Sequence, residues 1–192
     1  MRIIHYPHPA LRHKSKPLSR IDADFKKIVR EMFDLMYEHK GVGLAANQVE
    51  LPYRFFIINL EGDPAKAEGF VFINPVISRR RGTAEGEEGC LSFPEIYAPV
   101  KRSEKIVISA YNLAGEEVNY ELNGMFARAV QHEYDHLDGI LFIDRVSEAA
   151  LMSIKDALSD LESEFQGQRH RGGIPDDRQI ATRLAELESL RT

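Results

Sequence analysis

Residues 124–139 read GMFARAVQHEYDHLDG, and this stretch predicts a helix at the centre of the fold that ends before Gly139. On such a helix His132 and His136 lie on one face, one turn apart, so their imidazoles can reach the same ion. Glu133 follows the first histidine and is the expected general base for a water molecule at that ion. A metal-binding HExxH helix is therefore one interpretation. An ordinary amphipathic helix with solvated polar residues is the other.

The length and composition of the chain favour one globular domain. It has 192 residues, of which 43% are hydrophobic, enough for a sizeable core. The formal net charge of -5 argues against a nucleic-acid-binding surface, so we expect no direct sequence-specific contact with nucleic acid. No apolar run is long enough to span a bilayer, and residues 1–7 lack the apolar region of a signal peptide. We expect a cytoplasmic protein without membrane contact.

The patterns of apolar residues favour the α+β class. Spacings of three and four predict helices over residues 22–39, 124–137, 147–165 and 177–190. Runs of β-forming residues predict strands over residues 54–60, 70–73, 105–111 and 117–122. Because strands and helices do not alternate, a parallel doubly wound sheet is not expected. We predict antiparallel sheets packed around the helix that carries HExxH, with an additional C-terminal helix.

The two histidines need a further protein ligand, because a catalytic metal usually takes three and keeps one position open. One HExxH pattern ends in another histidine, but Phe142 holds that position here. Another pattern takes a glutamate from a later helix, and residues 148–164 include three without a local signature. Cys90 is the remaining candidate. It adjoins Gly89, which lets the backbone approach a ligand, and a thiolate binds zinc or ferrous iron strongly. The residues alone leave this choice open.

Three blocks of sequence occur in a fixed order: GVGLAANQ at Gly41–Gln48, EGCLS at Glu88–Ser92 and QHEYDHL at Gln131–Leu137. They match the GxGxAAxQ, EGCLS and QHExDHL motifs of peptide deformylases, and the chain resembles the bacterial, metal-dependent members of that family. The opening residues Pro9–Arg12 are also similar. The resemblance covers about residues 1–150. It is specific because all three blocks are intact and in the order of the family.

The resemblance implies an enzyme that removes the formyl group from the N-terminal formyl-methionine of newly synthesised polypeptides and releases formate. It implies one ion per chain, Fe²⁺ with Zn²⁺, Ni²⁺ or Co²⁺ as replacements, held by Cys90, His132 and His136. The Gln48 side-chain amide and the Leu91 backbone N–H are the implied donors to the oxyanion that develops in the reaction. The expected partners are N-formyl-methionyl nascent peptides, and a transient ribosome contact is left open.

The resemblance also implies a cleft for the substrate. Backbone groups near Gly43 and Leu44 would pair with the peptide as an added strand, which reads main chain more than side chains. Gly89 would let the backbone come close to the ligand. Met125 and Ala129 share a helix face with the first histidine, so they are candidates for the pocket of the substrate methionine. Met125 suits an ordinary core position equally well.

Four further positions carry expectations drawn from the resemblance. Glu88 and Arg102 are expected to form an ion pair that holds the segment around Cys90, and the alternative is two exposed charges in a loop. Two positions depart from the family pattern. Tyr97 stands where some bacterial members have an arginine that anchors the peptide. Arg128 stands where some relatives are apolar, and it either points outward or alters the preference for the second substrate residue.

The composition of the chain changes after the third predicted helix. We predict a catalytic domain over residues 1–165 and a C-terminal extension over residues 166–192. From Gln166 to Asp177 the sequence is rich in Gln, Gly, Arg and Pro, which indicates a flexible linker. The remainder is expected to form a short helix.

Overall fold

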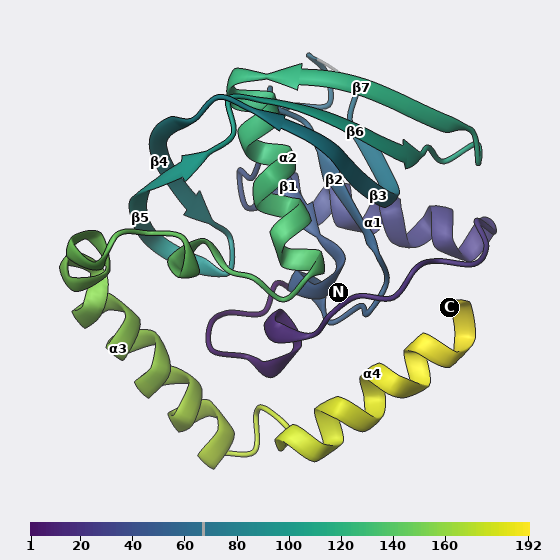
Figure 1. Cartoon of the computed structure of the whole chain (residues 1–192). Helices are drawn as coiled ribbons and strands as arrows, with labels where there is room; N and C mark the ends of the chain where they lie inside the picture. The colour runs from purple at the N-terminus through teal and green to yellow at the C-terminus, as the bar shows by residue number, and fades with distance from the viewer. Residues whose placement is uncertain (67) are drawn as a thin grey trace.

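The structure of the chain is a computed structural model that describes residues 1–66 and 68–192 (Figure 1). Three short 3-10 helices, marked η, accompany the α-helices and strands. In chain order the elements are η1 (Pro9–Arg12), α1 (Ala23–Glu38), β1 (Gly43–Ala45), η2 (Ala46–Val49), β2 (Phe55–Ile58), β3 (Phe70–Arg81), β4 (Ala84–Cys90), β5 (Phe93–Arg102), β6 (Lys105–Tyr111), β7 (Glu117–Asn123), α2 (Gly124–Leu137), η3 (Phe142–Asp144), α3 (Glu148–His170) and α4 (Asp177–Arg191).

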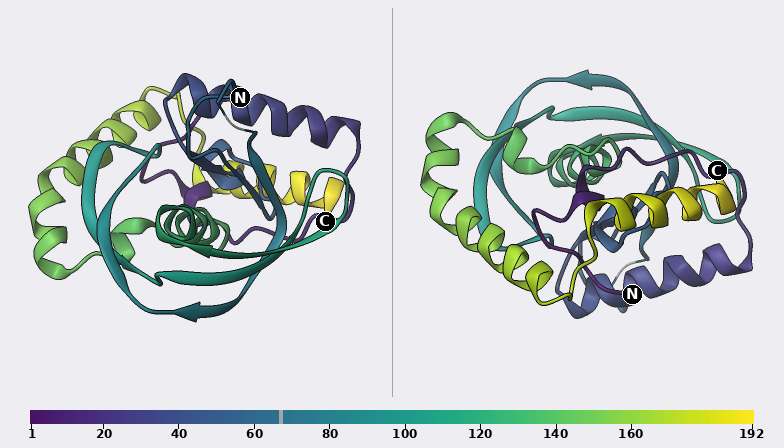
Figure 2. Two further views of the ribbon diagram at one scale, coloured as in Figure 1. Left: turned by 90° about the horizontal axis from the view of Figure 1, so that it is seen from above. Right: turned by 90° about the horizontal axis from the view of Figure 1, so that it is seen from below.

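The strands form two antiparallel sheets. One has five strands in the order β1-β2-β3-β6-β7, and the other is the hairpin of β4 and β5. In the view from above, at the left of Figure 2, α2 lies end-on with strands around it. The predicted α+β class, with antiparallel sheets around the HExxH helix, is confirmed.

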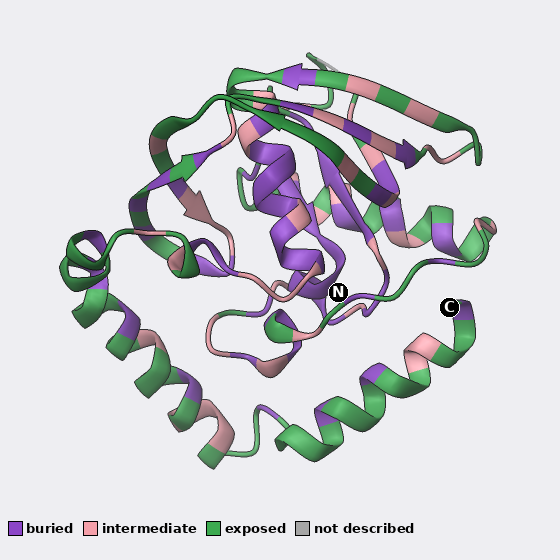
Figure 3. Cartoon of the chain, in the orientation of Figure 1, coloured by how far each residue is buried: buried purple, intermediate pink, exposed green. Residues whose placement is uncertain are grey.

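Helix α2 is buried along most of its length (Figure 3). Small or compact residues such as Ala127 and Val130 let it pack into an apolar cluster with Phe56 and Phe72 of the five-stranded sheet. Full burial of an aliphatic side chain such as Val130 stabilises the fold by about 1.5–3 kcal/mol. Five polar residues of the helix are buried as well, which restricts their side chains: Gln131, His132, Glu133, Asp135 and His136.

The first α-helix follows the sequence prediction closely. Asp22 caps α1 by accepting a hydrogen bond from the backbone N–H of Phe25 at 2.8 Å. Its apolar face, including Met32 and Met36, is buried against β1 and β2. A few residues after this helix the chain enters β1, whose three residues are all buried.

β4 and the region after residue 73 differ from the prediction because local propensity was a poor guide. β4, of sequence AEGEEGC, contains glycines and glutamates that disfavour isolated strands, and pairing with β5 overrides that preference. The predicted short strand from residue 70 continues as β3 to Arg81, with a register shift between Ile73 and Val76 around Pro75.

The predicted linker begins too early in the sequence. Helix α3 continues to His170, since Gln and Arg are good helix formers. A short turn that includes Gly172, at φ +75°, then leads to Asp176, which caps α4. α4 packs back onto η1, so the C-terminal residues are folded against the rest of the chain. No helix in the part of the chain that the structure describes is both long and apolar enough to cross a membrane.

Candidate active site

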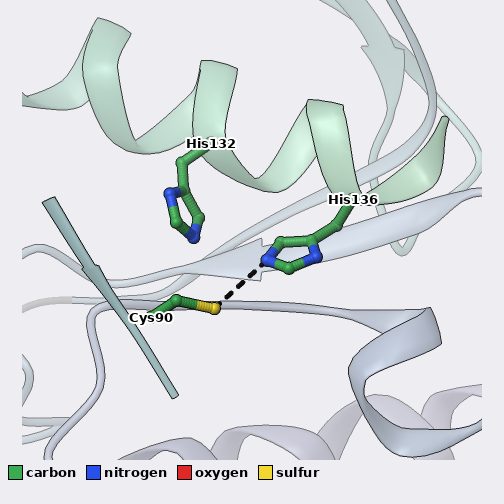
Figure 4. A group of neighbouring side chains, drawn as sticks. All are labelled: Cys90, His132 and His136. Atoms are coloured by element: carbon green, nitrogen blue, oxygen red, sulfur yellow. Dashed lines mark hydrogen bonds between the residues drawn. The ribbon is translucent and has the colours of Figure 1, made fainter. Parts of the chain in front are cut away.

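Cys90, His132 and His136 meet between the hairpin and the central helix (Figure 4). Each offers one ligand atom, and these three atoms lie within 4.8 Å of one another. The Cys90 Sγ atom is 3.3 Å from Nε2 of His136. One thiolate and two imidazoles form a donor set that suits zinc or iron and leaves room for a further ligand. The residues present therefore fit a divalent metal ion.

A buried carboxylate fixes the orientation of one imidazole. Nδ1 of His132 lies 3.0 Å from Oε2 of Glu88, which leaves Nε2 for an ion. Arg102 donates to both oxygens of Glu88 at 2.9 Å and also pairs with Asp135 of α2. The structure thus brings Glu88 and Arg102 together as an ion pair, and both side chains are buried.

The partners of Glu88 determine its charge. Burial opposes its ionisation, but hydrogen bonds from Arg102 and His132 outweigh burial and hold the pKa of Glu88 well below its usual range. Because Glu88 stays ionised, its carboxylate oxygen can accept a hydrogen bond from Nδ1–H of His132.

Glu133 combines burial with a free oxygen atom. Its carboxylate lies beside Gly43 of β1, where a Cβ atom would come within 2.9 Å of the Glu133 Cδ atom. The Oε2 atom has no hydrogen-bond partner among the described residues. Burial raises the pKa of Glu133 to about 7. A carboxyl group with such a pKa can accept a proton and return it near neutral pH.

The amide of Gln48 has one defined orientation. The backbone N–H of Ala45 donates to its Oε1 atom at 2.8 Å, so the NH₂ end must face the other way. That end lies 3.4 Å from Cys90 Sγ and 3.2 Å from Ser92 Oγ. Gln48 therefore presents a neutral donor to the space beside the thiol, and Leu91 lines the same space.

A cleft of about 610 Å³ opens over these groups. It is lined by His5, His39, Lys40, Gly41, Val42, Gly43, Gln48, Gly89, Cys90, Leu91, Phe93, Pro94, Glu95, Tyr97, His132 and Glu133. The sequence did not single out His5, His39, Lys40 or Glu95. They carry no motif, and only the folded chain brings their separate segments to one opening.

Three of the predicted substrate residues do not line this cleft. Leu44 is fully buried in the core beside α1. Met125 is 64% exposed, and Ala129 is buried in the cluster between α2 and the large sheet. The structure does not bring Met125 and Ala129 to the opening beside Cys90.

The two positions that depart from the family pattern have defined places. Tyr97 pairs with Gly89 across the hairpin, and its ring covers the glycine so closely that a Cβ atom would lie 2.5 Å from it. One of the two expectations for Arg128 was that it points outward, and that expectation is wrong. Its guanidinium group turns to the hairpin and donates to Glu88.

The chain is similar to known proteins over its whole length. The profile of the family described as Polypeptide deformylase matches residues 1–151. A peptide deformylase of Rhodopirellula baltica is 45% identical over 192 residues, which are 100% of this chain and 96% of that protein. The chloroplastic peptide deformylase 1B of Solanum lycopersicum is 40% identical over 184 residues, which are 95% of this chain and 65% of that protein.

Solved structures extend the similarity to the fold. The crystal structure of Arabidopsis thaliana peptide deformylase 1B in complex with an inhibitor superimposes with a TM-score of 0.85 at 39% identity, covering 92% of this chain and 97% of that one. The structure of the enzyme from Thermotoga maritima gives a TM-score of 0.71 at 43% identity, covering 76% and 97%. The chain thus belongs to the peptide deformylase family, metal-dependent hydrolases that remove the N-terminal formyl group from newly synthesised polypeptides.

Proposed function

We propose that Cys90, His132 and His136 hold the metal ion of this deformylase and that Glu133 transfers the proton of the attacking water. The observation that carries this assignment is the unpartnered oxygen of the buried Glu133 carboxylate, which lines the same cleft as Cys90 and His132, two of the three residues whose ligand atoms cluster. When bound, the ion supplies a Lewis acid that lowers the pKa of water and polarises the formyl oxygen. We propose Fe²⁺ as the natural ion, as the resemblance of the three sequence blocks implies. Zn²⁺, Ni²⁺ or Co²⁺ could replace it, because thiolate and imidazole donors suit all four ions.

Glu133 is assigned two proton transfers. It accepts a proton from water as the water oxygen forms a bond to the formyl carbon. It then gives that proton to the nitrogen of the methionine as the carbon–nitrogen bond breaks, so formate and a free amine leave. A pKa of about 7 suits a group that must act first as a base and then as an acid.

The negative charge on the formyl oxygen needs donors that are already in place. We assign the NH₂ group of Gln48 to this role, supported by the hydrogen bond from Ala45 that fixes its direction. The backbone N–H of Leu91 is the second proposed donor, supported by the place of Leu91 next to Cys90 in the lining of the cleft.

The peptide is proposed to bind as a strand beside β1. β1 is an edge strand of the large sheet, so one side of its backbone has no strand partner among the residues that the structure describes, and Gly43 of β1 lines the cleft. Backbone groups of Gly43 and Leu44 would pair with the peptide on one side. Gly89 lines the same cleft. Met125 and Ala129 stay predictions for the methionine pocket.

The substrate is a formyl-methionyl nascent peptide, and we propose a transient contact with the ribosome that produces it. We propose the cytoplasm as its location, supported by the bacterial relative of nearly the same length. The division into a catalytic domain over residues 1–165 and an extension over residues 166–192 is likewise a proposal.

The direct test is metal titration of the apo protein under exclusion of oxygen, with formyl-Met-Ala-Ser as the substrate and formate as the readout. We expect formate release to rise with Fe²⁺ and to level off at one equivalent. Cys90→Ser should need far more metal for the same rate. A peptide with an internal amide bond but no formyl group serves as the control, because a peptidase of the HExxH type would cleave it. Cleavage of that control without formate release would contradict the assignment.

A further inference from the structure

The proposed metal ligands come from two parts of the fold. His132 and His136 belong to α2, which packs on β1, β2, β6 and β7. Cys90 ends β4, and the hairpin of β4 and β5 packs on α3 and η3. The distance between the thiol and the imidazoles is therefore set by whatever joins the hairpin to α2.

Arg128 of α2 reaches both strands of that hairpin. Its Nη1 atom donates to Oε1 of Glu88 at 2.7 Å and to the carbonyl oxygen of Val100 at 2.9 Å, and it lies 3.4 Å from the carbonyl oxygen of Gly86. Its Nη2 atom donates to the carbonyl oxygen of Ala84 at 2.8 Å. The side chain is 11% exposed, so little water competes for these bonds. One guanidinium group thus joins α2 to β4 and β5.

The hairpin is shaped to receive this group. A Cβ atom on Gly86 would lie 3.1 Å from three atoms of the Arg128 guanidinium, which is closer than side chains normally pack. The absence of a side chain at Gly86 therefore lets β4 approach the arginine.

Arg102 joins the same two parts of the fold in a different way. It comes from the end of β5 and pairs with Glu88 and with Asp135 of α2. It does not donate to the carbonyl groups of the hairpin in the part of the chain that the structure describes. Arg102 therefore orients the Glu88 carboxylate, whereas the contacts of Arg128 locate the strands themselves.

We propose that Arg128 is a positioning residue that clasps the β4–β5 hairpin to α2 and so fixes Cys90 relative to the two histidines. The proposal rests on the assignment of these three residues as metal ligands. Without Arg128 the hairpin can move away from α2, and Arg102 still holds the carboxylate that orients His132. The bond between the ion and the thiolate of Cys90 is then the one that weakens.

The test uses the full chain loaded with Co²⁺, whose near-ultraviolet absorption includes a band from the metal–thiolate bond. In Arg128→Met we expect a weaker thiolate band and release of the ion to a chelator about tenfold faster, at the lower end of the range for groups that support metal ligands. Arg54→Met is the matched control. Arg54 is 14% exposed and pairs with Asp138 just beyond the same helix, but in the described part of the chain it forms no hydrogen bond or ion pair with the hairpin. It should leave the band and the release rate unchanged.

Two more variants distinguish a clasp on both strands from a mere positive charge beside Glu88. Arg128→Lys keeps a charge for Glu88 but cannot serve both strands, so its release rate should lie between those of the parent and Arg128→Met. A lysine variant with the parental rate would show that the charge alone suffices and would overturn the clasp. Gly86→Ala leaves the arginine intact but displaces its guanidinium, and it should also release the ion faster, which keeps the test decisive if Arg128→Met does not fold.

The outcomes also distinguish this proposal from the ligand assignment beneath it. A parental protein that binds no Co²⁺ at Cys90 would overturn both. A parental protein that binds Co²⁺ normally, with the same band and release rate in Arg128→Met, would overturn the clasp alone.

Discussion

At the residue scale, the site depends on how closely backbone and carboxylate approach each other. Gly43 gives Glu133 its room, and Ala45 orients Gln48 through one backbone N–H. Sequence motifs identified these catalytic candidates because HExxH and its companion blocks carry chemistry at fixed spacings. The same motifs did not predict the direction of Arg128, because that depends on a hairpin with weak strand signals.

A methyl group at residue 43 tests the fit between β1 and Glu133. In Gly43→Ala the new Cβ atom would lie 2.9 Å from Cδ of Glu133, so the carboxylate must move. We expect formate release to fall by at least about tenfold, because a misplaced base transfers protons poorly. Metal content should stay at one equivalent. Gly167→Ala, in α3, is the control and should keep parental activity; the same loss in both variants would contradict this account.

Removal of Arg102 tests the support of the metal ligands through Glu88. We expect Arg102→Ala to lower metal affinity by about 10- to 100-fold, measured by competition with a chelator, because groups that orient metal ligands typically contribute that much. Arg145→Ala is matched to it, since Arg145 also pairs with Asp135 but does not contact Glu88 in the described chain. Equal retention of metal in Arg102→Ala and the parent would rule out this role.

At the element scale, the C-terminal helix is part of the core. Ile180 and Leu184 of α4 belong to the same apolar cluster as Leu11 of η1. The sequence predicted this helix from its apolar stripe but placed a flexible linker before it. The sequence could not show where α4 packs, because its partners in η1 lie at the other end of the chain.

Substitution of two leucines of α4, one buried and one exposed, tests this packing. Leu184 is 5% exposed and Leu190 is 60% exposed. We expect Leu184→Ala to lower the free energy of unfolding by about 2–5 kcal/mol, as for other buried leucines. Leu190→Ala should change it by less than about 0.5 kcal/mol. Denaturant unfolding of both variants is the measurement, and equal effects would mean that α4 does not pack as described.

At the scale of the whole molecule, segments that lie far apart in the sequence contact one another. Arg191 near the C-terminus pairs with Asp22, which caps α1, and its carbonyl oxygen accepts from Ser19. The three sequence blocks likewise converge on one cleft from separate elements. The resemblance predicted that convergence. Composition and periodicity alone could not, because neither reports which distant segments meet.

The ion pair between Arg12 and Asp144 also joins two distant segments, and its contribution to stability depends on pH. Burial opposes the ionisation of Asp144, but hydrogen bonds from Arg12 and from the backbone N–H of Leu141 outweigh it and lower the pKa of Asp144 below 3.8. A lowered pKa means that the carboxylate stabilises the fold above pH 3.8 and that this stability is lost as the pH falls through the pKa of the folded state.

We therefore expect Asp144→Asn to lower the free energy of unfolding at pH 7 and to do so less below pH 3.8. Because both partners are more than one-third exposed, the effect at pH 7 should be no more than about 1 kcal/mol. Urea unfolding at several pH values measures it. A difference between variant and parent that grows as the pH falls would contradict the assigned sign.

Formate release by Glu133→Gln, purified without oxygen and compared with the parent at equal metal content, tests whether Glu133 transfers the proton. Glutamine keeps the size of the side chain but cannot take a proton from water. We predict that the variant binds one equivalent of metal and that its rate of release from formyl-Met-Ala-Ser falls by about 10²- to 10⁴-fold. A metal-loaded variant that releases formate at the parental rate would contradict the assignment of Glu133 and the mechanism built on it.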